Sequence, residues 1–578
     1  MHILQKIICA VLILILSGSF CFAQQIDMKN YEGGWLGTLE SSDIFTFEIT
    51  IKKIKSPAYE FEIKNNKTSI KKDFVADKNG FINLKIDNNS SFKGYINKRN
   101  IEGFLQTGIM QHHISLKNSH KNIYTGKWNL FLVSDLNSEL FLSIENGDGE
   151  KYEAYSFSGD KRIPGFMNYD FEKKSDELFF KDMRTGIQWT AKLAYPKIFL
   201  DVTLFGEKIT EIELAITEES WSPKNHYGIV LFDSDLPEDM NDEWKVSNIK
   251  KEGFDELLLK NLIDSINSGS ITNTHSVLIA RNGHLIFEKY FSGFNASVPH
   301  DMRSASKSIS SAITGFAINK GYLKSVNEKL YDLLPEKYKY TENSDERKSR
   351  IKIKDLLTMS SGIDAVDFGM DKESPASEDV YQSSNDWIKT ILEAPMINEP
   401  GTHAFYGTAN PYLLGIALDH EIKEPMEFFI HKDLFAPLGI NNYLLQNDID
   451  GKPYFGGGIY MTPRDMLKFG QMYLDKGKWN GKQIISKEWV EESFGKYLIL
   501  ENTAQKNEYG YLWWHYNYKI GNVSIESIEA RGAGGQYIFV IPKYNLTAVI
   551  TSANFRNGRY WQPEKIMESY ILPAITTY

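Results

Sequence analysis

Short runs of alternating apolar and polar residues dominate the chain from about residue 24 to residue 240. The run Ile44-Phe45-Thr46-Phe47-Glu48-Ile49-Thr50-Ile51 is typical, and clusters of Asn, Asp, Gly and Lys separate such runs. A two-residue period places every second side chain on the same face of a strand. The pattern predicts a mostly antiparallel β domain over residues 24–240.

A weak internal similarity runs through this region. Tyr31-Glu-Gly-Gly-Trp35 precedes the apolar run at residues 45–51, and Tyr124-Thr-Gly-Lys-Trp128 precedes another at residues 140–144. Two related β units would explain the similarity, as would one β-barrel-like module. The Gly-x-Trp segments also fit strand openings in a sandwich that has no binding role.

The pattern changes after residue 240, where longer helical stretches appear. Helical periodicity dominates residues 304–474, and strand-like runs return over residues 510–552. Before both, two apolar runs flank Asn282-Gly283, a pair that favours a tight hairpin turn. This order predicts an α+β domain over residues 241–578, with an antiparallel sheet flanked by helices and an all-helical insertion.

Composition limits the classes of function. The chain has 578 residues, a net charge of -10 and no lysine- or arginine-rich arm, so we expect no nucleic-acid partner. Both cysteines, Cys9 and Cys21, lie within the first 23 residues. Without that segment the protein has no cysteine nucleophile, no disulfide and no cysteine-ligated metal.

Residues 1–23 have the three-part layout of a secretory signal peptide. Lys6 precedes an apolar run over residues 7–16, and small residues end at Ala23. We expect cleavage after Ala23 and export to the periplasm or the cell exterior, with no integral membrane segment remaining. Lipid attachment at Cys21 is the alternative, although Phe20 is a poor match to the small residue of a bacterial lipobox.

A serine and a lysine one helical turn apart begin the helical region. Ser304 and Lys307 precede apolar residues at positions 309, 312, 313, 316 and 317, the stripe of a half-buried helix. The free amides at a helix N-terminus favour an oxyanion, and a lysine that has lost its proton there acts as a base. The pair predicts a serine nucleophile that needs no histidine. The spacing alone is weak evidence, since Ser-x-x-Lys also begins at Ser69, Ser90, Ser158, Ser247, Ser349 and Ser493.

Further segments carry a family resemblance that runs from about Trp244 to the C-terminus. They are Val277–Glu288, His300–Ser308, Ile353–Gly362, Pro400-Gly401, Gly456–Asp465 and Tyr509–Trp514. Together they resemble the serine β-lactamase and penicillin-binding-protein-like superfamily, in its class C, esterase and 6-aminohexanoate-oligomer-hydrolase branch. The resemblance implies a β-lactamase/transpeptidase-like domain, an acyl-enzyme on Ser304 and no cofactor. The implied partner is a small-molecule or peptide-like ester or amide.

The family's second motif, Tyr-x-Asn, corresponds to Tyr406-Gly407-Thr408. By resemblance, Tyr406 relays protons with Lys307. That role calls for cationic charge to pull the tyrosine pKa below its solution value of about 10. The motif's asparagine is absent, and Thr408 or Asn410 is expected to replace its amide in binding substrate.

The third motif, Lys-Thr-Gly or His-x-Gly on the strand beside the nucleophile, maps best to Ala533-Gly534-Gly535. The glycines let substrate approach the backbone, and the amides of Ser304 and Gln536 are expected to form the oxyanion hole. Ala533 cannot hold a substrate carboxylate, so we expect ester or amide hydrolysis rather than efficient β-lactam or D,D-peptide turnover. Arg531 reaches the substrate only if the glycines bend the strand. A glycine cluster otherwise marks a tight turn or bulge.

Two other interpretations stay open at the level of sequence. A non-catalytic or very slow binding or sensing protein on the same fold would explain the missing asparagine and cation. A D,D-peptidase or β-lactamase is the alternative enzyme. A zinc hydrolase has little support, because His112-His113 lacks a His-Glu-x-x-His helix and such pairs are more often packing residues. We expect no metal. No motif encodes the natural substrate, the role of the β domain or the oligomeric state.

Overall fold

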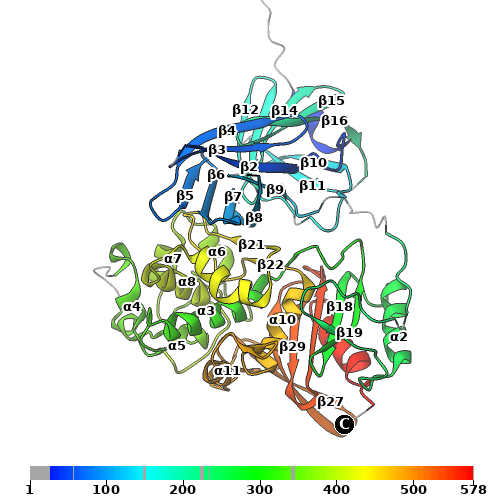
Figure 1. Cartoon of the computed structure of the whole chain (residues 1–578), viewed down its shortest axis with the longest axis vertical. Helices are drawn as coiled ribbons and strands as arrows, with labels where there is room; N and C mark the ends of the chain where they lie inside the picture. Colours follow the sequence, from blue (N-terminus) through cyan, green and yellow to red (C-terminus); the bar gives the residue numbers. More distant parts are fainter. Residues whose placement is uncertain are drawn as a thin grey trace, which may run out of the picture.

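The computed structural model describes residues 27–576, apart from residues 56, 121, 134, 148–150, 164, 220, 222–226, 234 and 340–344. The signal peptide predicted over residues 1–23 lies outside the described residues. Figure 1 shows a body of strands at the top and a second body of mixed helices and strands below it. None of the helices in the described part of the chain is both long and apolar enough to cross a membrane.

The N-terminal strands form two eight-stranded antiparallel units. In the first unit, each strand pairs with the next strand along the chain, except that β4 does not pair with β5. The last strand, β9, pairs with β2. Its strands are β2 (Thr46–Lys55), β3 (Ala58–Lys64), β4 (Ser69–Val75), β5 (Phe81–Lys85), β6 (Ser90–Ile96), β7 (Asn100–Thr107), β8 (Met110–His120) and β9 (Ile123–Asn129).

The second unit is completed by the first strand of the chain, which pairs with both β10 and β16. Its strands are β1 (Gly33–Thr38), β10 (Glu139–Asn146), β11 (Tyr152–Ser158), β12 (Asn168–Lys174), β13 (Glu177–Asp182), β14 (Gln188–Ala194), β15 (Lys197–Leu204) and β16 (Glu207–Thr217). Trp35 and Trp128 are buried in one hydrophobic cluster shared by both units. The prediction of a mostly antiparallel, β-rich N-terminal region is confirmed.

A nine-stranded sheet forms the centre of the C-terminal body. In spatial order its strands are β17 (Lys245–Val246), β19 (His284–Tyr290), β18 (Thr274–Arg281), β30 (Leu546–Ser552), β29 (Gln536–Ile541), β28 (Val523–Gly532), β27 (Trp514–Ile520), β26 (Glu508–Tyr509) and β25 (Leu498–Ile499). Asn282 and Gly283 join β18 to β19 with φ values of 52° and 74°. The hairpin predicted from Asn-Gly is therefore present, because its two central residues adopt the left-handed conformation that such a turn requires.

Helices cover both faces of this sheet. Along β18, Val277 and Ile279 join the cluster under α2 (Glu256–Asn267) and α12 (Gln562–Ile566), while Leu278 and Ala280 join the cluster under α3 (Lys307–Asn319) and α10 (Pro463–Leu474). The remaining helices are α4 (Leu330–Leu333), α5 (Ile353–Leu357), α6 (Glu378–Gln382), α7 (Trp387–Glu393), α8 (Ala409–Glu421), α9 (Met426–Ile430) and α11 (Lys487–Ser493). The predicted α+β class, with a flanked antiparallel sheet, is confirmed.

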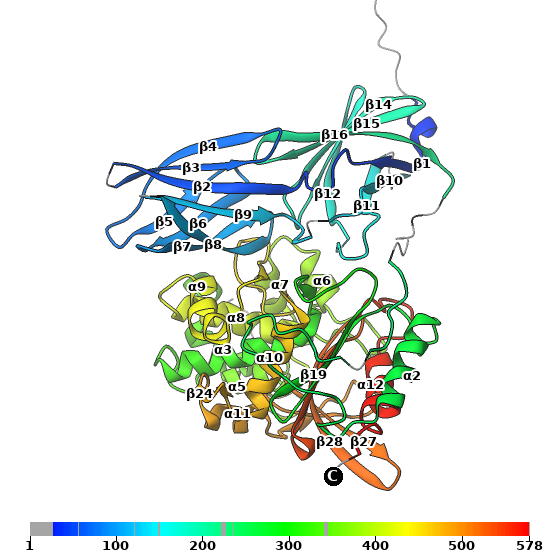
Figure 2. The ribbon, with the colours of Figure 1, turned by 45° about the vertical axis from the view of Figure 1, so that its right-hand side comes forward.

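One sheet joins the two bodies. The predicted helical stretch over residues 304–474 is interrupted by two short strands, β21 (Tyr443–Gln446) and β22 (Ile459–Met461). β21 pairs with β8 of the N-terminal body, and β22 pairs with β20 (His300–Asp301). Figure 2 shows β7 and β8 along the lower edge of the upper body, facing α9. Phe104 on β7 meets Phe428 on α9 edge to face, with ring centres 5.0 Å apart. A continuous hydrogen-bonded ladder therefore runs from the N-terminal unit to the start of the candidate nucleophile turn.

Candidate active site

The candidate nucleophile lies in a tight turn between β20 and α3. Residues 303–306 form a 3-10 turn, and the α-helix begins at Lys307. Arg303, just before the serine, has a φ of 49°, a conformation that costs energy outside glycine and concentrates at functional sites. Ser304 is half-buried, whereas Lys307 is only 1% exposed. The fold thus presents the hydroxyl and buries the amine.

Ser304 and Lys307 are brought together as their spacing suggested. The Lys307 ammonium nitrogen Nζ lies 2.7 Å from Ser304 Oγ, and it also donates to the carbonyl oxygen of Gly456. Gly457 packs against the backbone of the nucleophile turn, where a Cβ would lie 3.7 Å from the Ser304 nitrogen. A lysine in this position is within proton-transfer distance of the hydroxyl.

Tyr406 completes the group. The Lys307 Nζ lies 5.2 Å from the centre of the Tyr406 ring. Burial raises the pKa of Tyr406 above its ordinary value, although the Lys307 charge and hydrogen bonds with Ser304 and Lys307 oppose the rise. The expectation that cationic charge would pull this pKa down is wrong in its net direction, because desolvation of the buried phenolate outweighs the lysine. Tyr406 is therefore held in its protonated form.

Two aromatic rings and one amide hold Tyr406 in place. Phe368 stacks on it at 5.4 Å and Trp514 packs against it at 5.2 Å between ring centres. The side chain of Asn502 accepts from the Tyr406 backbone N–H at 2.8 Å and donates to the Phe368 carbonyl at 3.0 Å. Phe368 is 47% exposed, so it offers an apolar surface beside the reacting groups.

Two half-buried carboxyl groups, those of Asp367 and Glu378, interact with Lys307. Burial raises the pKa of Asp367 and of Glu378, and the Lys307 charge opposes both shifts. The Asp367 carboxylate accepts from the Glu378 backbone N–H at 3.0 Å. Glu378 accepts from the hydroxyl of Tyr454. Both acids interact electrostatically with the amine, and neither hydrogen-bonds to Ser304 in the described part of the chain.

Thr408 and Asn410 face the protein rather than an open site. Thr408 donates from its backbone nitrogen and from its hydroxyl to the Asp367 carboxylate, at 2.8 and 2.6 Å. Asn410 donates to the Gly407 carbonyl at 3.1 Å, and its buried side-chain oxygen has no partner among the described residues. The structure therefore uses Thr408 to orient Asp367. It does not present Thr408 as a replacement for the missing amide, because both of its donors are already engaged.

The glycine cluster lies at the end of β28. Ala533, Gly534 and Gly535 form the turn between β28 and β29, and both glycines have positive φ, 80° and 94°. The alternative interpretation, in which the glycine cluster marks a tight turn, therefore describes the backbone of residues 533–535. The closest approach to the nucleophile is at Gly532, where a Cβ would lie 2.3 Å from the Met302 carbonyl oxygen and 3.1 Å from the Ala305 nitrogen.

Gln536 is fully buried opposite Gly532. Its side-chain amide donates to the carbonyl oxygens of Ser552 and Ala533, at 2.5 and 3.3 Å. These bonds fasten the turn to the neighbouring strand β30. The role of the Gln536 backbone amide in an oxyanion hole stays a prediction.

Arg531 points away from the site, contrary to its candidacy for substrate binding. Its guanidinium forms ion pairs with Glu529 at 2.7 Å and with Glu564 of α12 at 2.9 Å. It also lies over the rings of Trp514 and Tyr537. Side chains alternate along a strand, and the bend begins only after Gly532, so Arg531 stays on the face covered by α12.

The two adjacent histidines separate onto opposite faces of β8. His112 packs against Trp128, with ring centres 5.1 Å apart. His113 stacks on His431 of the C-terminal body at 4.1 Å and bonds to Glu102 at 3.1 Å. The ligand atoms of Glu102, His113 and His431 lie within 4.8 Å of one another. Stacked imidazoles direct their nitrogens along parallel planes rather than toward one centre, so this cluster packs the two bodies together.

Sequence reasoning missed Asp367, Glu378 and Gly532. Asp367 lies in an irregular segment with no periodic pattern, and Glu378 begins a short helix, so neither carries a local signal. Gly456 was within a segment of the family resemblance, but its carbonyl contact with Lys307 depends on the tertiary fold. Gly532 is adjacent to the predicted motif and is distinguished only by strand register.

Comparisons with known proteins fit this geometry. Residues 266–565 match the model of the family described as Beta-lactamase, which is 300 of the 578 residues. A curated relative, a 6-aminohexanoate-dimer hydrolase from Paenarthrobacter ureafaciens, is 24% identical over 313 residues, or 50% of this chain and 75% of the relative.

Solved structures with similarity to part of this chain include a simvastatin synthase from Aspergillus terreus, with a TM-score of 0.43 and 17% identity over 55% of this chain and 97% of its own. An octameric penicillin-binding protein homologue from Pyrococcus abyssi has a TM-score of 0.40 and 20% identity over 55% of this chain and 76% of its own. The family match, rather than these two structures, carries the assignment.

Proposed function

The chain belongs to the beta-lactamase family and is a serine hydrolase, and from that premise we propose that it cleaves an ester or amide through an acyl-enzyme on Ser304. The observation that carries the proposal is the 2.7 Å contact between Lys307 Nζ and Ser304 Oγ, with Tyr406 packed against the same lysine. Burial keeps this contact out of bulk water, where an ammonium would be hydrated and inert.

The reaction proceeds in two steps. The Ser304 hydroxyl attacks the substrate carbonyl while its proton passes to the unprotonated amine of Lys307. Tyr406 then donates its proton to the leaving alcohol or amine as the tetrahedral intermediate collapses, and the proton on Lys307 restores the phenol. In the second step water attacks the acyl ester, the same two groups transfer its proton back to Ser304, and the acid leaves.

Lys307 must lose its proton for this chemistry. Burial raises the pKa of Asp367 and of Glu378, and the Lys307 charge opposes both shifts, so the two acids belong to the electrostatic environment of the amine. We assign to these acids an electrostatic role beside the amine, not contact with substrate.

The substrate class follows from what is missing beside the nucleophile. Ala533 occupies the place where the family's Lys or His holds a carboxylate, and Arg531 is engaged with Glu529 and Glu564. An ester or amide without a carboxylate at that position fits better than a penicillin or a D-Ala-D-Ala peptide. The curated relative is named for hydrolysis of a 6-aminohexanoate dimer, which supports an amide or ester substrate here.

The N-terminal sequence supports export, with action in the periplasm or outside the cell. Its charged start, short apolar run and small residues before position 24 are those of a cleaved leader. N-terminal sequencing of the protein secreted by a bacterial host is expected to begin at Gln24. Recovery of the intact Met1 end from the cytosol would contradict the assignment.

The first experiment combines covalent labelling with turnover. The protein is treated with a fluorophosphonate, the modified peptide is mapped by mass spectrometry, and hydrolysis of a p-nitrophenyl ester is followed in parallel. We expect labelling at Ser304, continuous turnover and loss of both in Ser304→Ala. Labelling without turnover would indicate a binding or sensing protein instead. Penicillin acylation as fast as ester acylation would overturn the substrate class.

A further inference from the structure

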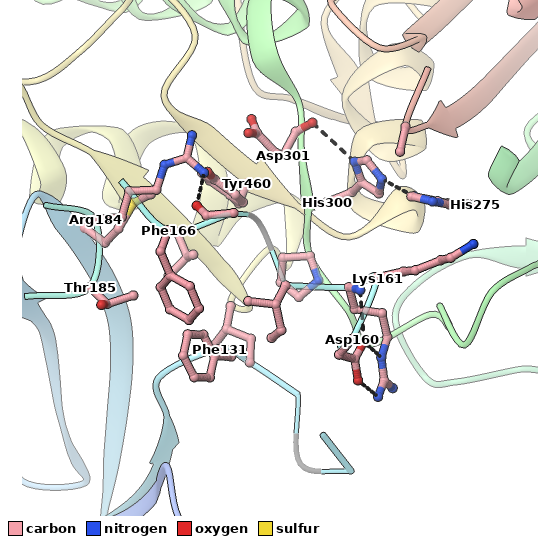
Figure 3. A pocket seen from close by; sticks show the side chains of 18 of the residues that line it. Phe131, Asp160, Lys161, Phe166, Arg184, Thr185, His275, His300, Asp301 and Tyr460 are labelled. Atoms are coloured by element: carbon pink, nitrogen blue, oxygen red, sulfur yellow. Dashed lines mark hydrogen bonds and ion pairs between the residues drawn. The ribbon is translucent and has the colours of Figure 1, made fainter. Parts of the chain in front are cut away.

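A cavity of about 520 Å³ lies between the N-terminal and C-terminal bodies. Strands and loops of the N-terminal body form one wall, and β20, β21, β22 and the loop after β30 form the other. Figure 3 shows side chains from both walls directed into one space. A volume of this size accommodates a drug-sized organic molecule.

The floor of the cavity is the sheet that joins the two bodies. Asp301 pairs with Tyr460, Leu444 pairs with Tyr460, and Leu444 also pairs with His112. Directly paired residues of antiparallel strands project from the same face. These four lining residues therefore form one row that begins in the N-terminal unit and ends at Asp301, three positions before Ser304.

The cavity adjoins the nucleophile turn, rather than Ser304 itself, through Arg303 and Phe555, which both line it. The Arg303 guanidinium lies 5.1 Å from the centre of the Phe555 ring and pairs with Asp301 at 2.9 Å. The Phe555 ring also fills the space at Gly534, where a Cβ would lie 2.5 Å from it. One end of the cavity therefore lies next to the turn that carries Ser304 and the turn that follows β28.

The middle of the cavity is apolar. Phe131 and Phe166 meet edge to face with ring centres 6.0 Å apart. Leu132, Ile163 and Phe294 extend this surface. An aliphatic or aromatic portion of a ligand that packs against these side chains is removed from water, which favours binding.

Most charges on the walls are already compensated. Arg162 pairs with Asp160 at 2.7 Å, and Arg303 pairs with Asp301. Asp182 accepts from the backbone nitrogens of Met167 and Thr185. Burial keeps the lining histidines neutral, since it lowers the pKa of His112 to about 3 and of His300 to about 4 and holds that of His275 well below its usual value.

Two lining cations, Arg184 and Lys161, form no ion pair with any residue in the described part of the chain. Lys161 is close to His275, whose pKa its charge lowers, and Arg184 is close to Tyr460. Figure 3 shows these two cations on opposite sides of Phe131 and Phe166. The cavity thus has an apolar centre and an uncompensated positive charge at either side.

Arg184 keeps one guanidinium nitrogen available to the cavity. Its Nη1 donates to the Gly165 carbonyl at 3.2 Å, and its Nε is buried without a hydrogen-bond partner among the described residues. Because the buried Nε is out of reach of a ligand, Nη2 is the donor that a carboxylate in the cavity would meet, and the charge of the guanidinium adds to that hydrogen bond. His112 Nδ1, another buried nitrogen of a lining residue, is also without a partner in that part of the chain.

We propose that this interdomain cavity is a substrate subsite, in which the N-terminal β body binds an apolar chain that ends in a carboxylate anchored by Arg184. The scissile ester or amide then lies at the Arg303 and Phe555 end, beside Ser304. The proposal rests on the proposed acyl transfer at Ser304 and adds its substrate class. Ala533, in the motif beside the nucleophile, cannot hold a carboxylate, so the proposal assigns recognition of the carboxylate to the N-terminal body.

The test begins with binding, which needs no turnover. Titration calorimetry on the full chain carrying Ser304→Ala compares phenylbutyrate with its neutral amide. We expect tighter binding of the acid, a loss of about 10- to 100-fold for the acid alone in Arg184→Gln, and a smaller loss in Arg184→Lys. Arg99→Gln, which removes an exposed cation of the same body, is the matched control and is expected to bind both probes as the parent does.

Kinetics on the active protein then test the assignment to substrate. p-Nitrophenyl acetate carries no remote carboxylate, whereas the mono-p-nitrophenyl ester of suberic acid carries one. Arg184→Gln is expected to lower kcat/KM for the suberate ester by about 10-fold or more and to leave the acetate unchanged. If Ser304 is not labelled and p-nitrophenyl acetate is not hydrolysed, the proposed acyl transfer at Ser304 is wrong, whatever the binding experiment shows. Equal binding of acid and amide, or an unchanged ratio between the two esters, overturns the subsite.

Discussion

Replacing Gly532 with Ala tests how closely β28 must approach the nucleophile turn. The added Cβ would lie 2.3 Å from the Met302 carbonyl oxygen and 3.1 Å from the Ala305 nitrogen. Both atoms belong to the backbone around Ser304, and neither can rotate away as a side chain can. Either the strand or the turn must therefore move.

The size of the effect follows from the distance to be restored. An ordinary non-bonded contact is about 3.5 Å, so the strand and the turn must separate by about 1 Å. A displacement of about 1 Å at a reacting group costs about 100-fold in rate, or about 2.7 kcal/mol in the activation barrier. Overpacking also lowers the free energy of unfolding by about 1 to 3 kcal/mol.

The assay separates misplacement of the nucleophile from loss of stability. kcat/KM for p-nitrophenyl acetate, the rate of fluorophosphonate labelling and the melting temperature are measured on Gly532→Ala and on Gly470→Ala. Gly470 lies on α10, where a Cβ would meet Ile538 at 2.7 Å, far from the nucleophile turn in sequence and without contact to it. We expect both variants to have a lower melting temperature. Only Gly532→Ala is expected to have a lower kcat/KM and a lower labelling rate. Wild-type kinetics in Gly532→Ala would refute the idea that this contact positions Ser304.

Three further results are expected. Lys307→Ala and Tyr406→Phe should retain the fold, as judged by circular dichroism, while the acylation rate falls by about 10²- to 10⁴-fold, and unchanged rates would remove these residues from the relay. Burial raises the pKa of Glu378 above 4.5, so unfolding releases a proton above that pH and stability is lost as pH rises through the folded pKa. The melting temperature of Glu378→Gln relative to wild type should therefore increase from pH 4.5 to pH 8, and a difference independent of pH would contradict the burial of an ionisable carboxyl. Burial and the neighbouring His113 lower the pKa of His431 to about 4 from 6.5, so unfolding takes up a proton and stability is lost as pH falls through that window. His431→Gln should flatten the fall in melting temperature between pH 6.5 and pH 4, and an unchanged slope would assign that fall to other groups.

Local signals predicted those parts of the structure that depend on neighbours in sequence. Asn282-Gly283 specified a hairpin because the turn needs two residues that tolerate positive φ. Ser304 and Lys307 were found by the three-residue spacing that places two side chains on the same side of a helical turn, and the structure sets their reacting atoms 2.7 Å apart. The antiparallel pattern of the N-terminal region was equally local.

Features that depend on long-range pairing were not predictable in the same way. The pairing of Leu444 with His112 joins strands separated by more than 300 residues, and neither strand is distinguished by its own pattern. The pKa of Tyr406 rose rather than fell because the degree of burial around it is set by Phe368 and Trp514, from two distant segments. Arg531 could be placed only once the register of β28 and the position of Glu564 were known.

The hydrogen-bonded pairing of β8 with β21 has a consequence for producing the C-terminal body without the N-terminal body. If the C-terminal body were produced alone, β21 would lose its partner at residues 444–446 and expose unpaired N–H and C=O groups along an edge. Such an edge recruits any strand with a free side, including the same strand of a second copy. We therefore expect a shortened version to self-associate at residues 444–446, the edge that β8 covers in the natural chain.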